Sequence, residues 1–511
     1  MKRIFRISKI VVIIAMTVAL VSCHDLLDEP TENTIFTEAT DYTISENIIL
    51  PLVGVYGELY DRGWENHLLI AVRGDDVNHG GLGDQQDYAE TDFYRYNKDF
   101  WMYNAVWQGL YSDIFIALSA MDEFELYREN GASPAIADQY VAEAKVVESW
   151  LLFQVSRVWG DVLIPVSTDP SELLLSTISS KQEVMEYISS RMDEAIPSLP
   201  AVHPNERTDL KGGVTRFTAL AVKALANLEL ENYQAVADAT SQIISSGHFS
   251  LFPDFYNLFK IPGKLADENL LEFQYSDFGQ GSGTSRNHNW SPYGPQSWTP
   301  LVEGVTAGWG FFEPSLKWIK FMLDRGERIR LETSVLFTNS GIEELKSDPN
   351  YSQLPGWISN VTPSGDIIND FDRAIFSSGK HYLPSNQLTP GRTTYGSNKN
   401  WPIIRYAEIL LMHAEALTRG ATSTVMTADD AVNLVRERAG LTPLTGVTAD
   451  QVMEEKFAEL AMEWGIRYYD MIRLETYNEL SYDGRTFNPS EDIYLPYPQN
   501  QVDLLPILGE E

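Results

Sequence analysis

The sequence predicts a mainly α-helical protein: a scaffold of helical pairs with long irregular loops and little β-structure. Three observations lead to this fold class. Apolar residues recur at three- and four-residue steps in residues 45–247 and 401–480, which is the period of an amphipathic helix. Both stretches contain helical pairs of similar length. Residues 248–400 lack this period and are rich in Gly, Pro, Ser, Asn and aromatic residues. We therefore expect residues 45–511 to form one domain, in which a loop-rich insertion interrupts a helical scaffold.

Residues 1–22 have the three zones of a secretory signal peptide. A positively charged start is followed by an apolar run of roughly 12 residues, too short for a membrane-spanning helix of about 20. The run ends in LVSC (residues 20–23), which resembles the lipobox of bacterial lipoproteins, where the cysteine is lipidated and becomes the new N-terminus. Cys23 is the single cysteine of the chain. We predict that Cys23 carries acyl chains such as palmitate and that residues 23–44 are a tether.

Four amphipathic helices are predicted in the N-terminal half of the domain. The first is marked by apolar residues at helical steps. The third begins at Pro134, a residue suited to the first turn of a helix. The fourth is stopped by Pro197. Residues 61–98, between the first two helices, show no period and are expected to be irregular. The predicted helices cover residues 48–59, 100–127, 134–158 and 181–196.

Two later stretches, 216–247 and 404–440, follow one plan. Each has a helix, a short break and a second helix that ends at a glycine, the residue that most easily adopts the left-handed conformation of a helix C-terminus. Each pair is about 34 residues long, the length of a tetratricopeptide repeat. Residues 450–464 and 466–480 are predicted to add a final helical pair. In the loop-rich insertion we expect only one short helix, near residues 314–324.

Charge and composition exclude several classes of protein. The net charge is −34 and the Lys and Arg residues are not clustered, so the chain should not bind nucleic acid, which needs clustered basic residues. It also lacks a basic amphipathic helix for a membrane surface, so lipid alone would hold the protein to a membrane. The hydrophobic fraction of 44% argues against disorder.

The sequence lacks the motifs of common hydrolases and metal sites. No His-Glu-x-x-His and no Gly-x-Ser-x-Gly motif is present. Conspicuous acidic residues have structural explanations; Glu463, for example, lies four positions before Arg467, a spacing that stabilises helices. The run from Arg73 to Asn78 resembles a cation loop only loosely, and a calcium ion there stays an open alternative. We predict a protein that is not an enzyme and has neither a cofactor nor a metal site.

Two segments combine aromatic rings with polar side chains, the mixture that carbohydrate recognition needs, because sugars present apolar C–H faces and hydroxyl edges. One lies within residues 61–98 and the other within 276–310. The alternative is that these rings fix long loops to the scaffold. By helical spacing, Trp101, Trp107, Trp150 and Trp159 are expected to be mostly core. The predicted ligand-binding residues are Trp64, Asp75, Asp76, Asn78, Tyr88, Arg286, Trp290, Tyr293, Trp298 and Trp309.

Several stretches follow one another in an order that a known family shares. They include PLVGVYGELY (51–60), RVWGDVLIP (157–165), EVMEYISSRMDEAIPSLP (183–200), WPIIRYAEILLMHAEAL (401–417), RERAGL (436–441) and EEKFAELAMEWGIRYYDMIR (454–473). Together they resemble the SusD/RagB family, the surface glycan-binding lipoproteins of Bacteroidetes. The chain departs from the family at Glu148-Ser149, where Arg-Ala is common, and at its PILGEE ending. These departures mark a divergent member.

The resemblance implies a function and a location. Family members capture oligo- or polysaccharide and pass it to a TonB-dependent outer-membrane transporter, with the ligand held on loops from the two aromatic segments. The protein would be lipid-anchored in the outer membrane and face the cell exterior. Two alternatives stay open: a peptide-binding or other nutrient-binding protein on a transporter without glycan specificity, and a degradative enzyme.

Overall fold

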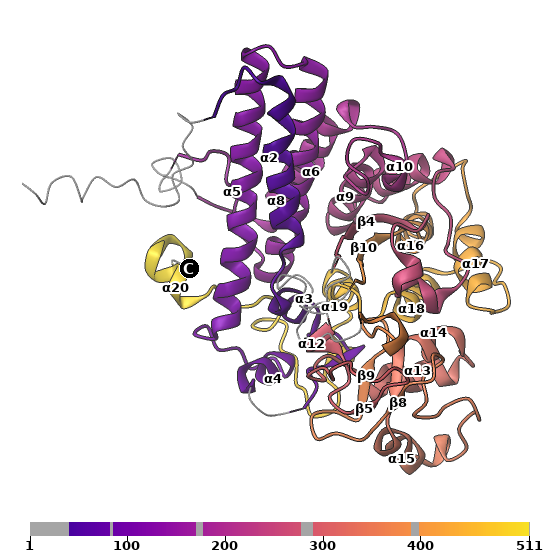
Figure 1. The fold of residues 1–511 in the computed structure, drawn as a ribbon. Helices are drawn as coiled ribbons and strands as arrows, with labels where there is room; N and C mark the ends of the chain where they lie inside the picture. The colour runs from indigo at the N-terminus through magenta and orange to yellow at the C-terminus, as the bar shows by residue number, and fades with distance from the viewer. Residues whose placement is uncertain (1–39, 82–84, 170–176, 277–289, 390–397, 510–511) are drawn as a thin grey trace, which may run out of the picture.

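We describe the fold from a computed structural model that covers residues 40–81, 85–169, 177–276, 290–389 and 398–509. The predicted signal peptide, Cys23 and most of the tether lie outside these residues. Within the described ranges, the protein is a helical scaffold with only short strands (Figure 1), which confirms the predicted fold class. No described helix has the length and apolar character needed to cross a membrane.

Four helices of the N-terminal half pack side by side as a bundle (Figure 1). They are α2 (Ile49–Tyr60), α5 (Trp101–Glu129), α6 (Pro134–Trp159) and α8 (Lys181–Ala195). A short 3-10 turn (Ser45–Ile48) leads into α2. Proline occupies the first turn of α6, where its missing N–H costs nothing. Ser180 and Glu183 form a capping box at the start of α8. The predicted boundaries differ from these by one or two residues.

The predicted helical pairs also form, and they pack against one another. The first pair is α9 (Arg216–Glu229) and α10 (Tyr233–Ser246), and the second is α16 (Tyr406–Thr418) and α17 (Ala428–Arg438). Helix α10 lies against α16, where Thr240 Oγ1 and His413 Nδ1 are 2.8 Å apart. Gly247 ends α10 with a φ of 71°, as a C-terminal glycine should. Helices α18 (Ala449–Leu460) and α19 (Ile466–Arg473) follow.

The strands of the described residues occur as five antiparallel pairs. The longest pair, β4 with β10, lies beside the helical pairs and carries Arg405 at its end. The others join distant loops to one another. The pairs are β4 (Asn269–Phe273) with β10 (Trp401–Arg405), β1 (Val77–Asn78) with β6 (Glu313–Pro314), β2 (Val162–Leu163) with β3 (Ile178–Ser179), β5 (Trp298–Thr299) with β8 (Ile367–Ile368), and β7 (Val335–Phe337) with β9 (Phe376–Ser378).

The structure corrects the expectation that residues 61–98 and most of 248–400 are irregular. Helix α3 (Trp64–Ala71) is buried from Asn66 to Ala71, so it has no polar face and no amphipathic period. The other missed helices are only one or two turns long. They are α4 (Gln86–Asp92), α11 (Phe255–Leu258), α12 (Trp290–Tyr293), α14 (Ile329–Ser334) and α15 (Asn339–Ser347), beside the expected α13 (Leu316–Asp324).

The predicted last helix was too long, and the C-terminus holds structure that the sequence did not indicate. Helix α19 ends at Arg473, and a separate 3-10 turn covers Tyr477–Leu480. Further on, α20 (Gln499–Leu504) and a 3-10 turn (Pro506–Gly509) pack beside α5.

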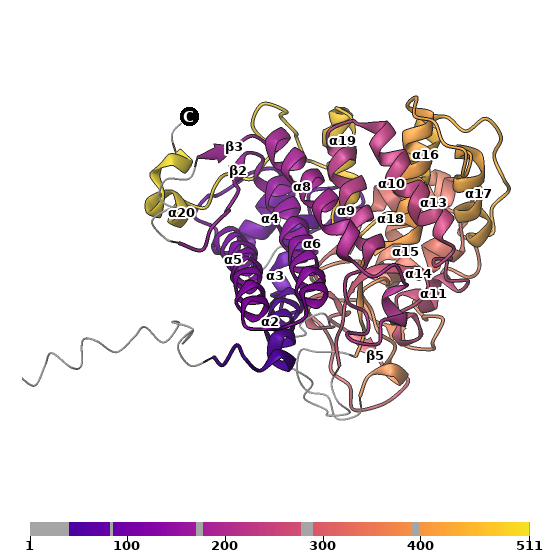
Figure 2. The ribbon, with the colours of Figure 1, turned by 90° about the horizontal axis from the view of Figure 1, so that it is seen from above.

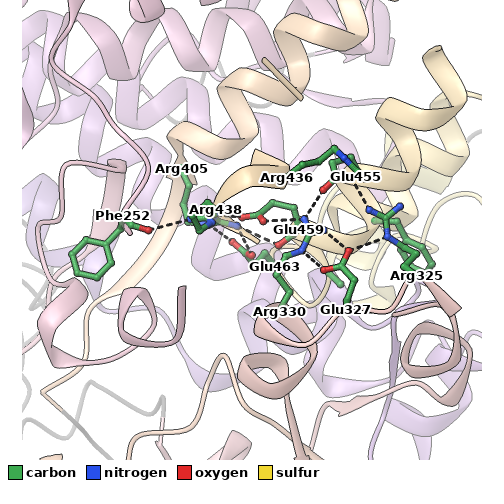
Figure 3. Close-up of polar contacts among 12 residues, drawn as sticks. Phe252, Arg325, Glu327, Arg330, Arg405, Arg436, Arg438, Glu455, Glu459 and Glu463 are labelled. Carbon is green, nitrogen blue, oxygen red and sulfur yellow. Dashed lines mark hydrogen bonds and ion pairs between the residues drawn. The ribbon is translucent and has the colours of Figure 1, made fainter. Parts of the chain in front are cut away.

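A buried network of arginines and glutamates joins the loop-rich insertion to the helical pairs (Figure 3). Glu459 of α18 is its centre: its Oε1 lies 3.0 Å from Arg405 Nη1 and its Oε2 lies 3.3 Å from Arg330 Nη1. Arg405 also contacts Glu268 at 2.5 Å and Glu463 at 2.7 Å. These charges are taken from water, so each must be compensated inside the protein.

The turn between α18 and α19 is held in a strained conformation. Met462 has a φ of 66°, Trp464 of 47° and Gly465 of 69°. Two side chains from the N-terminal half accept hydrogen bonds from its backbone. The N–H of Met462 donates to Asp76 Oδ2 at 2.6 Å, and the N–H of Trp464 donates to His67 Nε2 at 3.2 Å. The turn thereby joins the α18–α19 region to the segment around α3, far away in the sequence.

Gly465→Ala should destabilise the protein by about 2–4 kcal/mol. An added Cβ would lie 2.7 Å from the carbonyl oxygen of Ile70 and would occupy a left-handed conformation. Urea denaturation of the purified protein measures the change. Gly57→Ala is the matched control: it lies in α2 with open space around it and should stabilise by about 0.5–1 kcal/mol. Equal effects of the two changes would contradict the strained turn.

Stability should fall as the pH falls from about 4.5 toward 2, partly through Glu459. Burial raises the pKa of this carboxyl, but Arg438, Arg405 and Arg330 outweigh burial and lower it to about 2. A lowered folded-state pKa stabilises at higher pH, and this contribution is lost when the carboxyl is protonated. Glu459→Gln should cost about 3–5 kcal/mol at pH 7 and show a shallower decline below pH 4.5.

Urea denaturation across this pH range measures both effects. Glu344→Gln, an exposed position in α15, is the control and should follow the wild-type curve. A Glu459→Gln curve parallel to that of the wild type would contradict the assignment.

Candidate functional site

Three tryptophans from distant parts of the chain meet at one surface. We call Trp64, Trp101 and Trp309 the tryptophan platform. The Trp64 ring lies 5.8 Å from that of Trp101 and 5.4 Å from that of Trp309, to which it is perpendicular. Trp101 is 46% exposed, and the other two are partly buried. The structure thus brings Trp64 and Trp309, predicted in separate segments, into one site.

Two rings of the tryptophan platform begin helices, and the third lies in a segment between strands. Trp64 is the first residue of α3 and Trp101 is the first residue of α5. Trp309 lies in a segment that hydrogen-bonds to the chain around α12: its N–H donates to Ser291 O, and those of Gly308 and Gly310 donate to Pro295 O and Gly294 O. A Cβ at Gly308 would lie 2.3 Å from the carbonyl oxygen of Gly294, so the two segments approach at glycine distance.

A second layer of rings supports the platform from below. Trp64 stacks on buried Phe311 at 6.2 Å and 26°. Tyr88 meets Phe311 edge-on at 5.9 Å, and the Arg373 guanidinium lies 4.1 Å from the Phe311 ring centre. Such pairs favour fixed ring orientations. The platform is therefore rigidly seated.

Tyr293, a predicted ligand residue, lies in this interior instead. It is fully buried, stacks on His381 at 4.5 Å and contacts His67 Nδ1 through its hydroxyl at 3.1 Å. Burial, with a smaller effect of Lys399, lowers the pKa of His67 to about 3, so the ring is neutral. Because Nε2 accepts from Trp464, Nδ1 carries the proton and donates to Tyr293. The Trp464 N–H thus fixes the tautomer of a scaffold histidine, and the Tyr293 hydroxyl accepts the hydrogen bond from its Nδ1–H.

The structure also corrects the prediction for Asp75, Asp76 and Tyr88, all of which are buried. Asp75 Oδ1 lies 2.7 Å from Arg467 Nε, and its Oδ2 lies 2.6 Å from Lys317 Nζ. Asp76 holds the α18–α19 turn, and burial raises its pKa to about 6. The sequence showed these carboxylates in a loop but did not show the cations that distant parts of the chain supply, such as Lys317 and Arg467.

The remaining predicted residues lie apart from the platform or outside the described side chains. Asn78 is partly buried, donates to Glu313 Oε2 at 3.3 Å and accepts from Arg485 at 2.9 Å. Trp298 lies in β5 and meets Tyr382 edge-on at 6.3 Å in a separate apolar cluster. Trp290 begins α12, but its side chain is outside the described part, as is all of Arg286.

Trp101 is the platform residue that the sequence reasoning assigned to the core. Trp107, Trp150 and Trp159 are buried as expected. Trp101 lies six positions before Trp107, which places the two rings on different faces of α5. The six-residue spacing could have indicated that Trp101 is exposed if Trp107 is buried, because a helix packed mainly on one side cannot bury both faces.

Titratable groups outside the platform serve the scaffold. Burial raises the pKa values of Glu272, Glu313 and Glu408 to about 7. Glu272 accepts from Asn400 at 2.6 Å and from Asn269 at 2.7 Å, and Glu313 accepts the N–H groups of Ile375 and Phe376. In the described part of the chain, no group of three or more His, Cys, Asp or Glu residues is placed to hold a metal ion.

Known proteins of similar sequence and structure share this architecture. A "SusD-like protein" of Bacteroides ovatus is 22% identical, over 99% of this chain and 98% of its own length. "SusD-like protein P2" of Formosa agariphila is 25% identical, over 98% and 96%. The structure of surface glycan-binding protein A from Bacteroides thetaiotaomicron, in complex with laminarihexaose, superposes with a TM-score of 0.73 at 22% identity, over 91% of this chain and 98% of that one.

A "laminarin binding SusD-like protein" superposes equally well, with a TM-score of 0.73 at 21% identity, over 89% of this chain and 97% of that one. The sequence profile of the SusD family matches residues 267–508. Together with relatives matched over almost their full length and a shared fold, this match supports the SusD/RagB family for the chain.

Proposed function

We propose that this protein is a surface-exposed glycan-binding lipoprotein that captures oligo- or polysaccharide and delivers it to a partner TonB-dependent outer-membrane transporter. The tryptophan platform carries the proposal. Large rings gathered at a protein surface are unusual enough to mark a binding site. Exposed Trp101 and the partly buried Trp64 and Trp309 offer apolar faces for the C–H groups of sugars.

Relatives support glycan as the ligand class. One structure of the same fold is described as a complex with laminarihexaose, and another as a laminarin-binding protein. At this surface, exposed Gln296 lies next to the chain at Gly310 and could hydrogen-bond to sugar hydroxyls. The platform and its neighbourhood offer both components of carbohydrate recognition.

Binding without catalysis is part of the proposal. A glycosidase needs two carboxyl groups at a fixed separation, one of them with a raised pKa, facing the sugar. The carboxyls of Glu272, Glu313 and Glu408, whose pKa values are raised, are all buried. Those of Glu272 and Glu313 also accept hydrogen bonds within the scaffold. We propose no catalytic residue, cofactor or metal.

The lipid anchor at Cys23 completes the proposed arrangement. Two or more acyl chains hold a protein stably to a membrane. The strongly negative sequence does not predict a basic amphipathic helix that could replace them. The ligand-binding domain would then face the cell exterior beside its transporter.

Trp101→Ala should weaken glycan binding about tenfold, a loss of about 1.4 kcal/mol, because it removes an exposed stacking ring. Calorimetry with purified, lipid-free protein and neutral oligosaccharides measures the affinity. Because Trp101 is exposed, the unfolding curve should change little. Trp357→Ala, a partly buried tryptophan outside the platform, is the matched control and should bind normally. Unchanged affinity of the Trp101→Ala protein for a glycan that binds the wild type would contradict the platform.

Cys23→Ala should release the protein from the outer membrane, because no other feature of the chain is proposed to hold it there. Fractionation of cells and immunoblotting measure the distribution. The purified variant should bind glycan like the wild type, since the anchor and the platform are separate. A variant that stays in the outer-membrane fraction would contradict the lipid anchor.

A further inference from the structure

A groove lies away from the tryptophan platform and shares no residue with it. It has a volume of about 920 Å³ and lies between α8, the end of α9, α19 and the segment that follows α19. Figure 2 looks onto the side of the molecule where these helices come together. We call it the α8–α19 groove and consider six of its lining residues: Lys181, Glu186, Glu229, Arg473, Tyr477 and Tyr494.

The floor of the groove contains polar atoms with unused hydrogen-bonding capacity. Arg473 is nine-tenths buried, and its Nη2 donates to Glu415 at 2.7 Å and to Asp470 at 2.8 Å. Its Nη1 is buried and has no hydrogen-bond partner among the described residues. Beside it, Glu229 Oε2 forms an ion pair with Lys181 Nζ at 2.8 Å, but it is buried and has no hydrogen-bond partner among the described residues.

An unfilled donor and an unfilled acceptor at the floor of one cavity indicate a missing partner. Leaving a buried polar group unpaired costs about 1–3 kcal/mol, so native proteins pair such groups with protein, water or ligand. A hydroxyl group can donate and accept at once. It could therefore accept from Arg473 Nη1 and donate to Glu229 Oε2.

Two tyrosines form the walls of the groove and are partly exposed. Tyr494 lies on Gly160, where a Cβ would come within 2.8 Å of its ring. Tyr477 stacks on Phe487 at 5.7 Å and 26°. Each ring is thus fixed from one side. Rings of this kind suit the apolar faces of a sugar.

The charges around the groove select against ions. Exposed carboxylates at the rim, Glu186, Asp193 and Glu231, would repel an anion, while Lys181 and Arg473 in the floor would repel a cation. A neutral ligand with many hydroxyl groups meets neither penalty. We propose that the α8–α19 groove is a second carbohydrate site that takes a neutral sugar residue. This inference rests on the proposed function and extends it from one glycan contact to two.

Crystals of the protein soaked separately in D-glucose, D-galactose and D-mannose test the proposal directly. We expect sugar density in the groove, with hydroxyls within about 3.2 Å of Arg473 Nη1 or Glu229 Oε2. An empty groove with all three sugars would overturn the inference. Density on the platform alone would overturn it too, yet leave the proposed function standing. Density in the groove alone would support the inference and count against the platform.

Solution binding separates a genuine site from binding at crystal concentration only. Ser190 is an exposed groove residue of α8, so Ser190→Trp should fill the groove without disturbing the buried floor. In a Trp101→Ala background, we expect this change to reduce the saturation-transfer NMR signal of the best-bound sugar at least fivefold. Ser245→Trp, at an exposed position of α10 outside the groove, is the matched control and should leave the signal unchanged. Equal signals from the two variants would refute the second site.

Discussion

The buried contact between Glu459 and its arginines is the interaction on which the rest of the structure depends. Arg405 comes from β10, Arg438 from α17 and Arg330 from α14, inside the loop-rich insertion. Removing any partner would leave a charge uncompensated in the interior, a cost of several kcal/mol. The network therefore requires three separate parts of the chain to be in place together, and it makes the long insertion part of the same folded unit as the helices.

The position of the platform follows from this constraint through a chain of contacts. Glu463 of the network lies in the strained α18–α19 turn, whose Trp464 N–H donates to His67. His67 lies in α3, the helix that begins with Trp64, and it contacts Tyr293 near the segment that carries Trp309. Buried polar contacts of this kind specify one arrangement, because alternatives leave groups unpaired. The positions of the platform rings therefore depend on charged residues deep inside the protein.

The helices could largely be predicted from the sequence, but the arrangement of the candidate site could be predicted only in part. The long helices have an apolar stripe with the 3.6-residue period, so α2, α5, α6 and α8 are found within one or two residues of their predicted bounds. Helix α3 escaped detection because it is buried on all sides. Trp64 and Trp309 were predicted in separate segments, and the structure places them together. Their meeting point depends on tertiary contacts that no local pattern contains. Asp75 illustrates the converse: in sequence it is a polar loop residue, and only the fold reveals Arg467 beside it.

Helix α5 sets the distance between the tryptophan platform and the point where the described chain begins. It begins at Trp101, and its 29 residues at 1.5 Å each span about 43 Å. Near its other end, Tyr127 contacts Tyr42, where the described chain begins, at 4.9 Å. One stiff rod thus separates the entry of the N-terminal segment from the exposed rings (Figure 1). If the platform binds glycan as proposed, the length of this single helix would set the distance between the bound sugar and the point where the N-terminal segment enters the domain.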